Sequence, residues 1–192
     1  PRRGVFKRRA ADSEASQIVA AHVDVALLVA ALNLDLNPRR IERYLVAARD
    51  AGAEPVVVLT KSDLASDLVS NIARIERIAG GAAVVALAAL HGEGLGGLAP
   101  WLKPGATCVL LGSSGAGKST LLNALAGAGI MRTNAVRAGD DRGRHTTTHR
   151  ELFRLASGAL VIDTPGMREL GLVAQDDALD ASFADVSELT GR

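Results

Sequence analysis

The stretch TCVLLGSSGAGKST, residues 107–120, joins a short apolar run to a glycine-rich loop. The loop fits the pattern G-x-x-x-x-G-K-[ST], and its flanks predict a strand over 107–111 and a helix over 118–126. Glycines let backbone N–H groups close round phosphate oxygens at the start of a helix. The residue frequencies of this chain produce the pattern by chance in roughly one such sequence in two hundred. We therefore predict a phosphate-binding loop.

Apolar runs and helical patterns alternate along most of the chain. Asn37-Pro38 is typical of a helix start, Ser66 is a predicted helix cap, and Gly80-Gly81 is a predicted helix end. Strands are predicted over 23–32, 56–59 and 84–88, a hairpin over 151–155 and 159–162, and helices over 37–51 and 66–79. This alternation predicts an α/β protein of the P-loop NTPase type, with a doubly wound, mainly parallel sheet and ligands at the carboxyl edge.

The motif Thr60-Lys61-Ser62-Asp63 follows the second predicted strand. The Asp63 carboxylate can accept hydrogen bonds from both N1–H and N2–H of guanine, a pair of donors that adenine lacks. The Lys61 stem can pack along the base, while Thr60 stands where Asn is usual. After the third strand, Ala88-Ala89 can offer the Ala89 N–H to guanine O6. The alternative is a plain Asp-containing turn, but the phosphate loop favours a guanine site.

The guanine motif precedes the phosphate loop in this chain, whereas most GTPases have the phosphate loop first. The order therefore predicts a circularly permuted GTPase. In this order Asp163-Thr164-Pro165-Gly166 leads towards the C-terminus. Loss of γ-phosphate contacts at Gly166 can then reposition whatever follows.

Magnesium and catalytic residues are predicted around that segment. Asp163 would hold Mg²⁺ through water, Ser119 would ligate it directly, and Gly166 N–H would meet the γ-phosphate. A second D-x-x-G pattern, at 140–143, has no strand before it and is set aside. Met167 stands where Ras-like enzymes have a water-orienting Gln, so the intrinsic rate is expected to be low.

The composition excludes several classes of protein. The chain has 192 residues, 48% of them hydrophobic, and a net charge of +1. Its single cysteine, Cys108, excludes an internal disulfide framework and is expected to be a small buried hydrophobe. No apolar run approaches the length of a membrane span, and no signal peptide opens the chain. We expect a cytoplasmic protein, and the start at Pro1 suggests a fragment.

With these motifs in place, the chain resembles the circularly permuted bacterial GTPases of the ribosome small-subunit-dependent GTPase A family (RsgA). The resemblance spans nearly the whole chain and depends on Pro1-Arg2-Arg3, the NPRRIERYL stretch at 37–45, 112–120, 143–148 and 163–170. It implies a late maturation factor of the small ribosomal subunit whose GTP hydrolysis that subunit stimulates. It also implies a monomer, rRNA as partner, and GTP, GDP and Mg²⁺ as ligands.

The resemblance also suggests the domain organisation. Residues 1–20 are expected to be a basic connecting segment after an N-terminal OB-fold, 21–175 the permuted GTPase domain, and 176–192 an acidic linker to a C-terminal zinc module. Zinc is expected only in that module, because residues 1–192 contain no Cys/His ligand set.

The polar segment 129–150 is long for a loop, which favours a functional role. Within it, Thr147 is predicted to complete the Mg²⁺ shell, and Lys118 to reach the β- and γ-phosphates. His145 is predicted to orient the attacking water, with Arg142 or Arg144 offsetting charge; contact of this loop with rRNA is equally open. Two other functions stay open: a nucleotide-dependent RNA-binding switch with negligible hydrolysis, and another P-loop NTPase.

The local charge favours rRNA contacts in two basic segments. Residues 1–9 hold five Arg or Lys and no acid, and 131–150 hold five Arg against two Asp. The predicted RNA contacts are Arg2, Arg3, Arg8, Arg9, Arg142, Arg144 and Arg150. The predicted nucleotide-binding residues are Thr60, Lys61, Asp63, Ala88, Ala89, Gly112, Ser113, Ser114, Gly115, Ala116, Gly117, Lys118, Ser119, Thr120 and Gly166.

Overall fold

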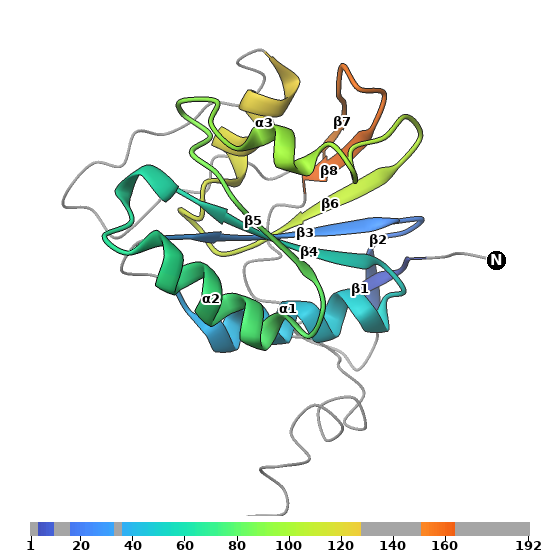
Figure 1. The fold of residues 1–192 in the computed structure, drawn as a ribbon. Coiled ribbons are helices and arrows are strands. Elements are labelled where there is room, and N and C mark those ends of the chain that lie inside the picture. Colours follow the sequence, from blue (N-terminus) through green and yellow to red (C-terminus); the bar gives the residue numbers. More distant parts are fainter. Residues whose placement is uncertain (1–3, 10–15, 33–35, 128–150, 164–192) are drawn as a thin grey trace, which may run out of the picture.

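The computed structural model describes residues 4–9, 16–32, 36–127 and 151–163. Six strands form one sheet in the order β5-β4-β3-β6-β8-β7, and all neighbours run parallel except β7 and β8 (Figure 1). The strands are β3 (Val25–Ala31), β4 (Glu54–Thr60), β5 (Ala83–Ala86), β6 (Thr107–Leu111), β7 (Glu151–Arg154) and β8 (Leu160–Asp163). The predicted mainly parallel α/β sheet is confirmed.

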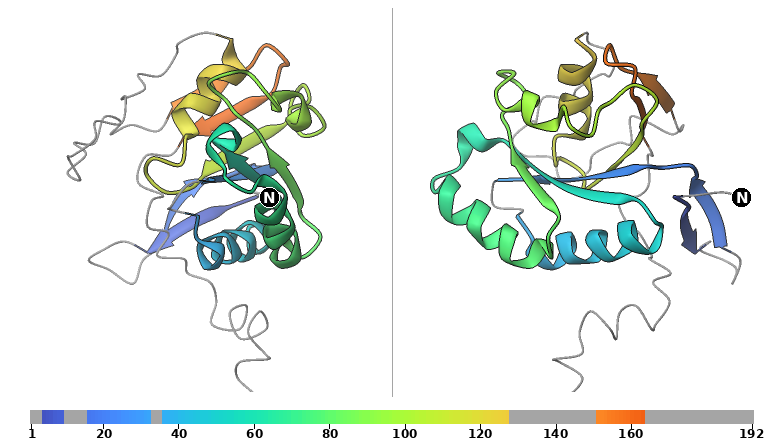
Figure 2. Two further views of the ribbon diagram at one scale, coloured as in Figure 1. Left: turned by 60° about the vertical axis from the view of Figure 1, so that its left-hand side comes forward. Right: turned by 45° about the vertical axis from the view of Figure 1, so that its right-hand side comes forward.

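Helices cover both faces of this sheet. The helices α1 (Pro38–Asp50) and α2 (Leu68–Ala79) lie on one face, and α3 (Lys118–Ala126) lies on the other (Figure 2). Two short 3₁₀ helices, η1 (Ser62–Leu64) and η2 (Leu95–Leu98), follow β4 and β5. The sheet is therefore the middle layer of three, as expected for parallel strands buried on both sides.

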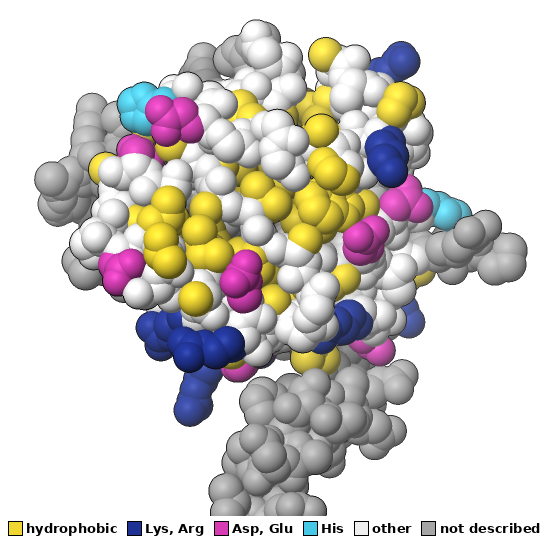
Figure 3. Space-filling view, viewed as in Figure 1, with side chains coloured by type: hydrophobic (Ala, Val, Ile, Leu, Met, Phe, Trp, Pro, Cys, Tyr) yellow, Lys and Arg dark blue, Asp and Glu magenta, His cyan; other side chains and the backbone are white. Residues whose placement is uncertain are grey.

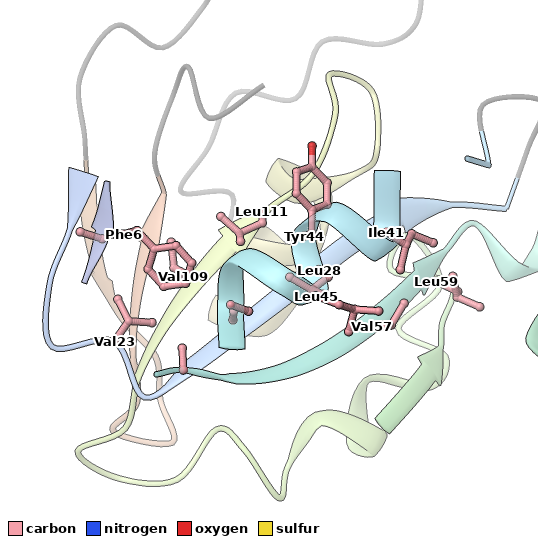
Figure 4. Packing of buried hydrophobic residues seen from close by; sticks show 14 of the residues in the cluster. Phe6, Val23, Leu28, Ile41, Tyr44, Leu45, Val57, Leu59, Val109 and Leu111 are labelled. Atoms are coloured by element: carbon pink, nitrogen blue, oxygen red, sulfur yellow. The ribbon is translucent and has the colours of Figure 1, made fainter. Parts of the chain in front are cut away.

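The two cores on either side of the sheet take alternate residues of the same strands. In β3, Val25, Leu27 and Val29 face the core under α3, whereas Ala26 and Leu28 face the core under α1 and α2. Figure 4 shows the second of these cores, with side chains from α1 meeting those of the central strands. Because both of its faces are buried, the central strand β3 is an unbroken apolar run.

The chain reverses its course across the sheet between β3 and β6. It runs outward from β3 through β4 to β5, then returns to β6, which pairs with the other side of β3. Such a reversal leaves a crevice at the carboxyl ends of the two central strands, where doubly wound proteins bind ligands. The loop that follows β6 therefore begins at the point where the fold favours a binding site.

An N-terminal hairpin that the sequence analysis did not anticipate packs against this core. Strands β1 (Phe6–Arg9) and β2 (Ser16–Ala20) pair antiparallel, and Phe6 is 2% exposed within the core under α1 (Figure 4). Gly4 has φ +53°, and a Cβ there would lie 1.9 Å from Val23 O. Residue 4 must therefore be glycine for the hairpin to meet the start of β3.

Most predicted strand boundaries differ from the observed ones by one or two residues, and hydrogen bonds explain the shift at α2 and at the end of β5. The cap of α2 is Asp67 and not Ser66, because the Asp67 carboxylate accepts a hydrogen bond from Ser70 N at 3.0 Å. Strand β5 ends at Ala86, because the N–H and C=O of Ala88 bond Glu93 instead of a strand. The predicted Asn37 cap of α1 is confirmed.

Candidate nucleotide-binding site

The phosphate loop is held by close backbone approaches at both of its ends. A Cβ on Gly112 would lie 2.3 Å from Val29 O, so the loop leaves β6 directly against β3. Gly117 has φ +89°, and a Cβ there would lie 3.2 Å from Thr60 Oγ1. Larger residues would push the loop away from the strands at both points. The shape of the loop is therefore set by packing.

The loop continues directly into α3, as the motif predicts. Lys118, Ser119 and Thr120 form the first turn of α3, the end of the helix at which the helix dipole favours an anion. The Lys118 ammonium donates to Gly112 O and Ser113 O, both at 2.7 Å. These bonds fold the ammonium over the loop, so positive charge lies where phosphate would enter.

Thr60 joins the guanine motif to the phosphate loop. Its side chain is buried, and Oγ1 donates to Ala116 O at 2.7 Å. Ala31 pairs with Thr60 in register, and β3 continues three residues past Leu28, the partner of Leu111. Thr60 therefore lies level with the phosphate loop and reaches its backbone. Thr60 stands where Asn is usual in this motif, and its hydroxyl supports the phosphate loop through the bond to Ala116 O.

The two loops predicted to bind the guanine base, which follow β4 and β5 and are called the base loops below, lie side by side. Leu87 N donates to Leu59 O at 2.9 Å, and Ser62 N donates to Leu87 O at 3.2 Å. Lys61 takes a left-handed conformation, with φ +58° and ψ +39°, which turns the chain from β4 into η1. Asp63 is thereby placed beside the turn that carries Ala88 and Ala89. Within the described residues, the Ala89 N–H donates to no backbone carbonyl, as its predicted contact with guanine O6 requires.

His91, a residue that the sequence analysis did not single out, lies in the turn after β5 against the predicted base-reading carboxylate. His91 Nε2 is 3.6 Å from Asp63 Oδ2. The turn itself is closed by His91 N donating to Ala88 O at 3.0 Å. No local pattern signals this contact, because it depends on two loops that lie 28 residues apart in the sequence.

The predicted magnesium residues include a carboxylate, Asp163, at the same edge of the sheet as the phosphate loop. Asp163 is 7% exposed and pairs in register with Leu110 of β6, two residues before the loop begins. Ser119 lies in the first turn of α3, beside the same loop. A hydroxyl and a carboxylate are oxygen donors of the kind that Mg²⁺ prefers, so these two residues fit the ion. Within the described ranges, no group of three or more His, Cys, Asp or Glu forms a separate metal cluster.

Several predicted site residues lie outside the described residues. They are Arg2, Arg3, Arg142, Arg144, His145, Thr147, Arg150, Gly166 and Met167. The backbone of Arg8 and Arg9 belongs to β1. The roles assigned to these residues stay predictions.

Cys108 lies in β6 and is fully buried, as expected. Burial, with a smaller contribution from Asp24, raises the pKa of the Cys108 thiol to about 11. The thiol is therefore inert at neutral pH. No helix in the described part of the chain is long and apolar enough to cross a membrane.

Comparison with known proteins places this geometry in a family. The model of the RsgA GTPase family matches residues 1–173. The small ribosomal subunit biogenesis GTPase RsgA of Opitutus terrae is 53% identical over 191 residues, which cover 98% of this chain and 52% of that protein. The chain thus spans about half the length of the curated relatives it matches.

Solved structures agree with this match. YjeQ from Thermotoga maritima superimposes with a TM-score of 0.62 at 30% identity, over 80% of this chain and 51% of that one. YloQ, described as a circularly permuted GTPase, gives a TM-score of 0.58 at 26% identity, over 96% of this chain and 63% of that one. The family match covers the phosphate loop, the guanine motif and the sheet that carries both. The chain belongs to the RsgA GTPase family.

Proposed function

We propose that this site binds GTP with Mg²⁺ and hydrolyses it to GDP and phosphate. The observation that carries the proposal is the bond from Thr60 Oγ1 to Ala116 O. This bond joins a motif suited to guanine to a loop suited to phosphates. One nucleotide would therefore contact both. A P-loop kinase or ATPase would need the loop but not the Asp63 motif.

The residues of the chain divide the work of binding. The loop N–H groups and Lys118 hold the phosphates, and Asp63 and the Ala89 N–H select guanine. Ser119, Asp163 and Thr147 would hold Mg²⁺, which when bound neutralises charge on the β- and γ-phosphates. We assign the orientation of the attacking water to His145, since Met167 cannot accept a hydrogen bond well.

We propose further that the protein matures the small ribosomal subunit, which stimulates its hydrolysis. The family membership and the name of the Opitutus terrae relative support this assignment. The arginines of segments 1–9 and 131–150 would contact rRNA phosphates, so that subunit binding weakens steeply with added salt. The protein would act in the cytoplasm as a monomer. Its GTPase domain would lie between an N-terminal OB-fold and a C-terminal zinc module.

The test combines nucleotide preference with stimulated hydrolysis. GTP, ATP and XTP would compete with a fluorescent guanine nucleotide, and phosphate release would then be measured with small subunits, with large subunits and alone. We expect the protein to prefer GTP and to release phosphate slowly without subunits. Small subunits should stimulate this release, and large subunits should not. In the His145→Ala variant, stimulation should fall much more than GTP binding.

Other outcomes would contradict the proposal in distinct ways. Preference for ATP would indicate another P-loop NTPase. GTP binding without stimulated release would indicate an RNA-binding switch. Equal losses of subunit binding and hydrolysis in His145→Ala would give that residue a docking role.

A further inference from the structure

The carboxylate assigned to guanine recognition faces a basic side chain on the neighbouring loop. The contact between His91 Nε2 and Asp63 Oδ2 joins two side chains that are 57% and 27% exposed. Figure 3 shows a histidine beside acidic side chains at the upper left of this face of the molecule. The pair therefore lies at the surface, where the base would be read.

Backbone hydrogen bonds hold both members of the pair in place. Ser62, directly before Asp63, donates its N–H to Leu87 O. The turn that carries His91 is closed by Ala88 N donating to Glu93 O at 3.0 Å and Glu93 N donating to Ala88 O at 3.2 Å. Gly94 completes this turn with φ +74°, where a Cβ would lie 2.6 Å from Ala86 O. The backbone thus fixes the position from which His91 reaches Asp63.

We propose that His91 is a positioning residue that orients the Asp63 carboxylate towards guanine. This inference rests on the proposed guanine-binding function and names the residue that sets the direction of base recognition. An ionised carboxylate has about four lone-pair directions on its two oxygens. Guanine N1–H and N2–H take one on each oxygen, so Oδ2 can face His91 and the base together. His91 therefore restrains the carboxylate without competing for it.

The charge of the imidazole determines the strength of this restraint. At 3.6 Å the contact is longer than a hydrogen bond, so the imidazole acts on the carboxylate mainly through the charge that it carries when protonated. Exposed ion pairs of this kind change an equilibrium constant by about two- to fivefold. We expect an effect of that size on base selectivity, and a small effect on phosphate binding.

The test compares GDP with IDP, whose hypoxanthine base lacks the N2 amino group. The ratio of the IDP to the GDP dissociation constant isolates the bond that Asp63 makes to this group. A charge series would be measured: His91→Lys, His91→Leu and His91→Glu. The ratio should be highest with Lys, about two- to fivefold lower with Leu, and lower again with Glu. Glu93→Gln, a charge change on the same turn, should leave it unchanged.

The outcomes separate this inference from the proposed function. Equal ratios across the series, or an equal fall in Glu93→Gln, would overturn the positioning role of His91. A protein without substitution that binds ADP as tightly as GDP would overturn the guanine site itself. Slow alkylation of Cys108 in each variant would show that the fold is intact.

Discussion

The phosphate loop follows β6 and the base loops follow β4 and β5, on either side of the central strand β3, yet they are built differently. The phosphate loop is shaped by backbone contacts, with Gly112 against Val29 O and Gly117 against Thr60. The base loops present side chains, of which Asp63 is partly exposed and contacts His91. We therefore propose that packing sets the affinity for phosphates, whereas the Asp63 carboxylate at the surface sets the choice of base. The two properties should separate under mutation.

The largest effect is expected at the phosphate end. Lys118→Ala removes a charged donor from the loop, and affinity should fall roughly 10- to 100-fold for every nucleotide. The IDP to GDP ratio should not change, because the base loops are untouched. Titration with fluorescent nucleotides measures both quantities. Lys103→Ala, at an exposed lysine outside the site, is the matched control. Wild-type affinity in Lys118→Ala would show that phosphates bind elsewhere.

Thr60 should affect both ends, since it belongs to the base motif and supports the phosphate loop. Thr60→Val keeps the shape of the side chain but leaves the buried Ala116 carbonyl without its hydroxyl partner. The free energy of unfolding should fall by about 1–3 kcal/mol, and GDP and IDP should weaken alike. Thr60→Ser keeps the donor and should recover most of the loss. If only GDP weakened, Thr60 would be a base contact instead of a support.

The smallest effect is the one that base-loop variants should have on Cys108, in the strand that leads to the phosphate loop. With its pKa raised to about 11 from 9.0, the thiol has roughly a hundredfold less thiolate at pH 7 than in the unfolded chain. Alkylation should therefore be slow in the native protein and fast in denaturant. Base-loop variants should not alter the slow rate. Fast labelling in such a variant would show that the two regions are not independent.

The sequence predicted the phosphate loop with its flanking elements correctly: β6 at Thr107–Leu111 and α3 at Lys118–Ala126 have the expected bounds. A glycine-rich loop between an apolar run and a helical pattern is a local signal. The cap of α2 was harder, because Ser66 and Asp67 are both good capping residues and only the bond to Ser70 N distinguishes them.

Features that depend on distant parts of the chain escaped prediction. Strand β1 has the sequence FKRR, in which only Phe6 is apolar, so no period of two is visible. Its place depends on Gly4 meeting Val23. The contact of His91 with Asp63 and the bond of Thr60 to Ala116 likewise join separate segments. Local patterns therefore located the loops, but not the contacts that join them.

The central claim is that the Asp63 carboxylate distinguishes guanine from xanthine while the phosphate loop binds independently. The most direct measurement is competition of GDP against XDP in Asp63→Asn. The amide donates where the carboxylate accepted, so preference should shift from guanine to xanthine while the best affinity remains close to that of the unsubstituted protein. Unchanged preference for GDP in Asp63→Asn would contradict the account, and so would loss of both nucleotides.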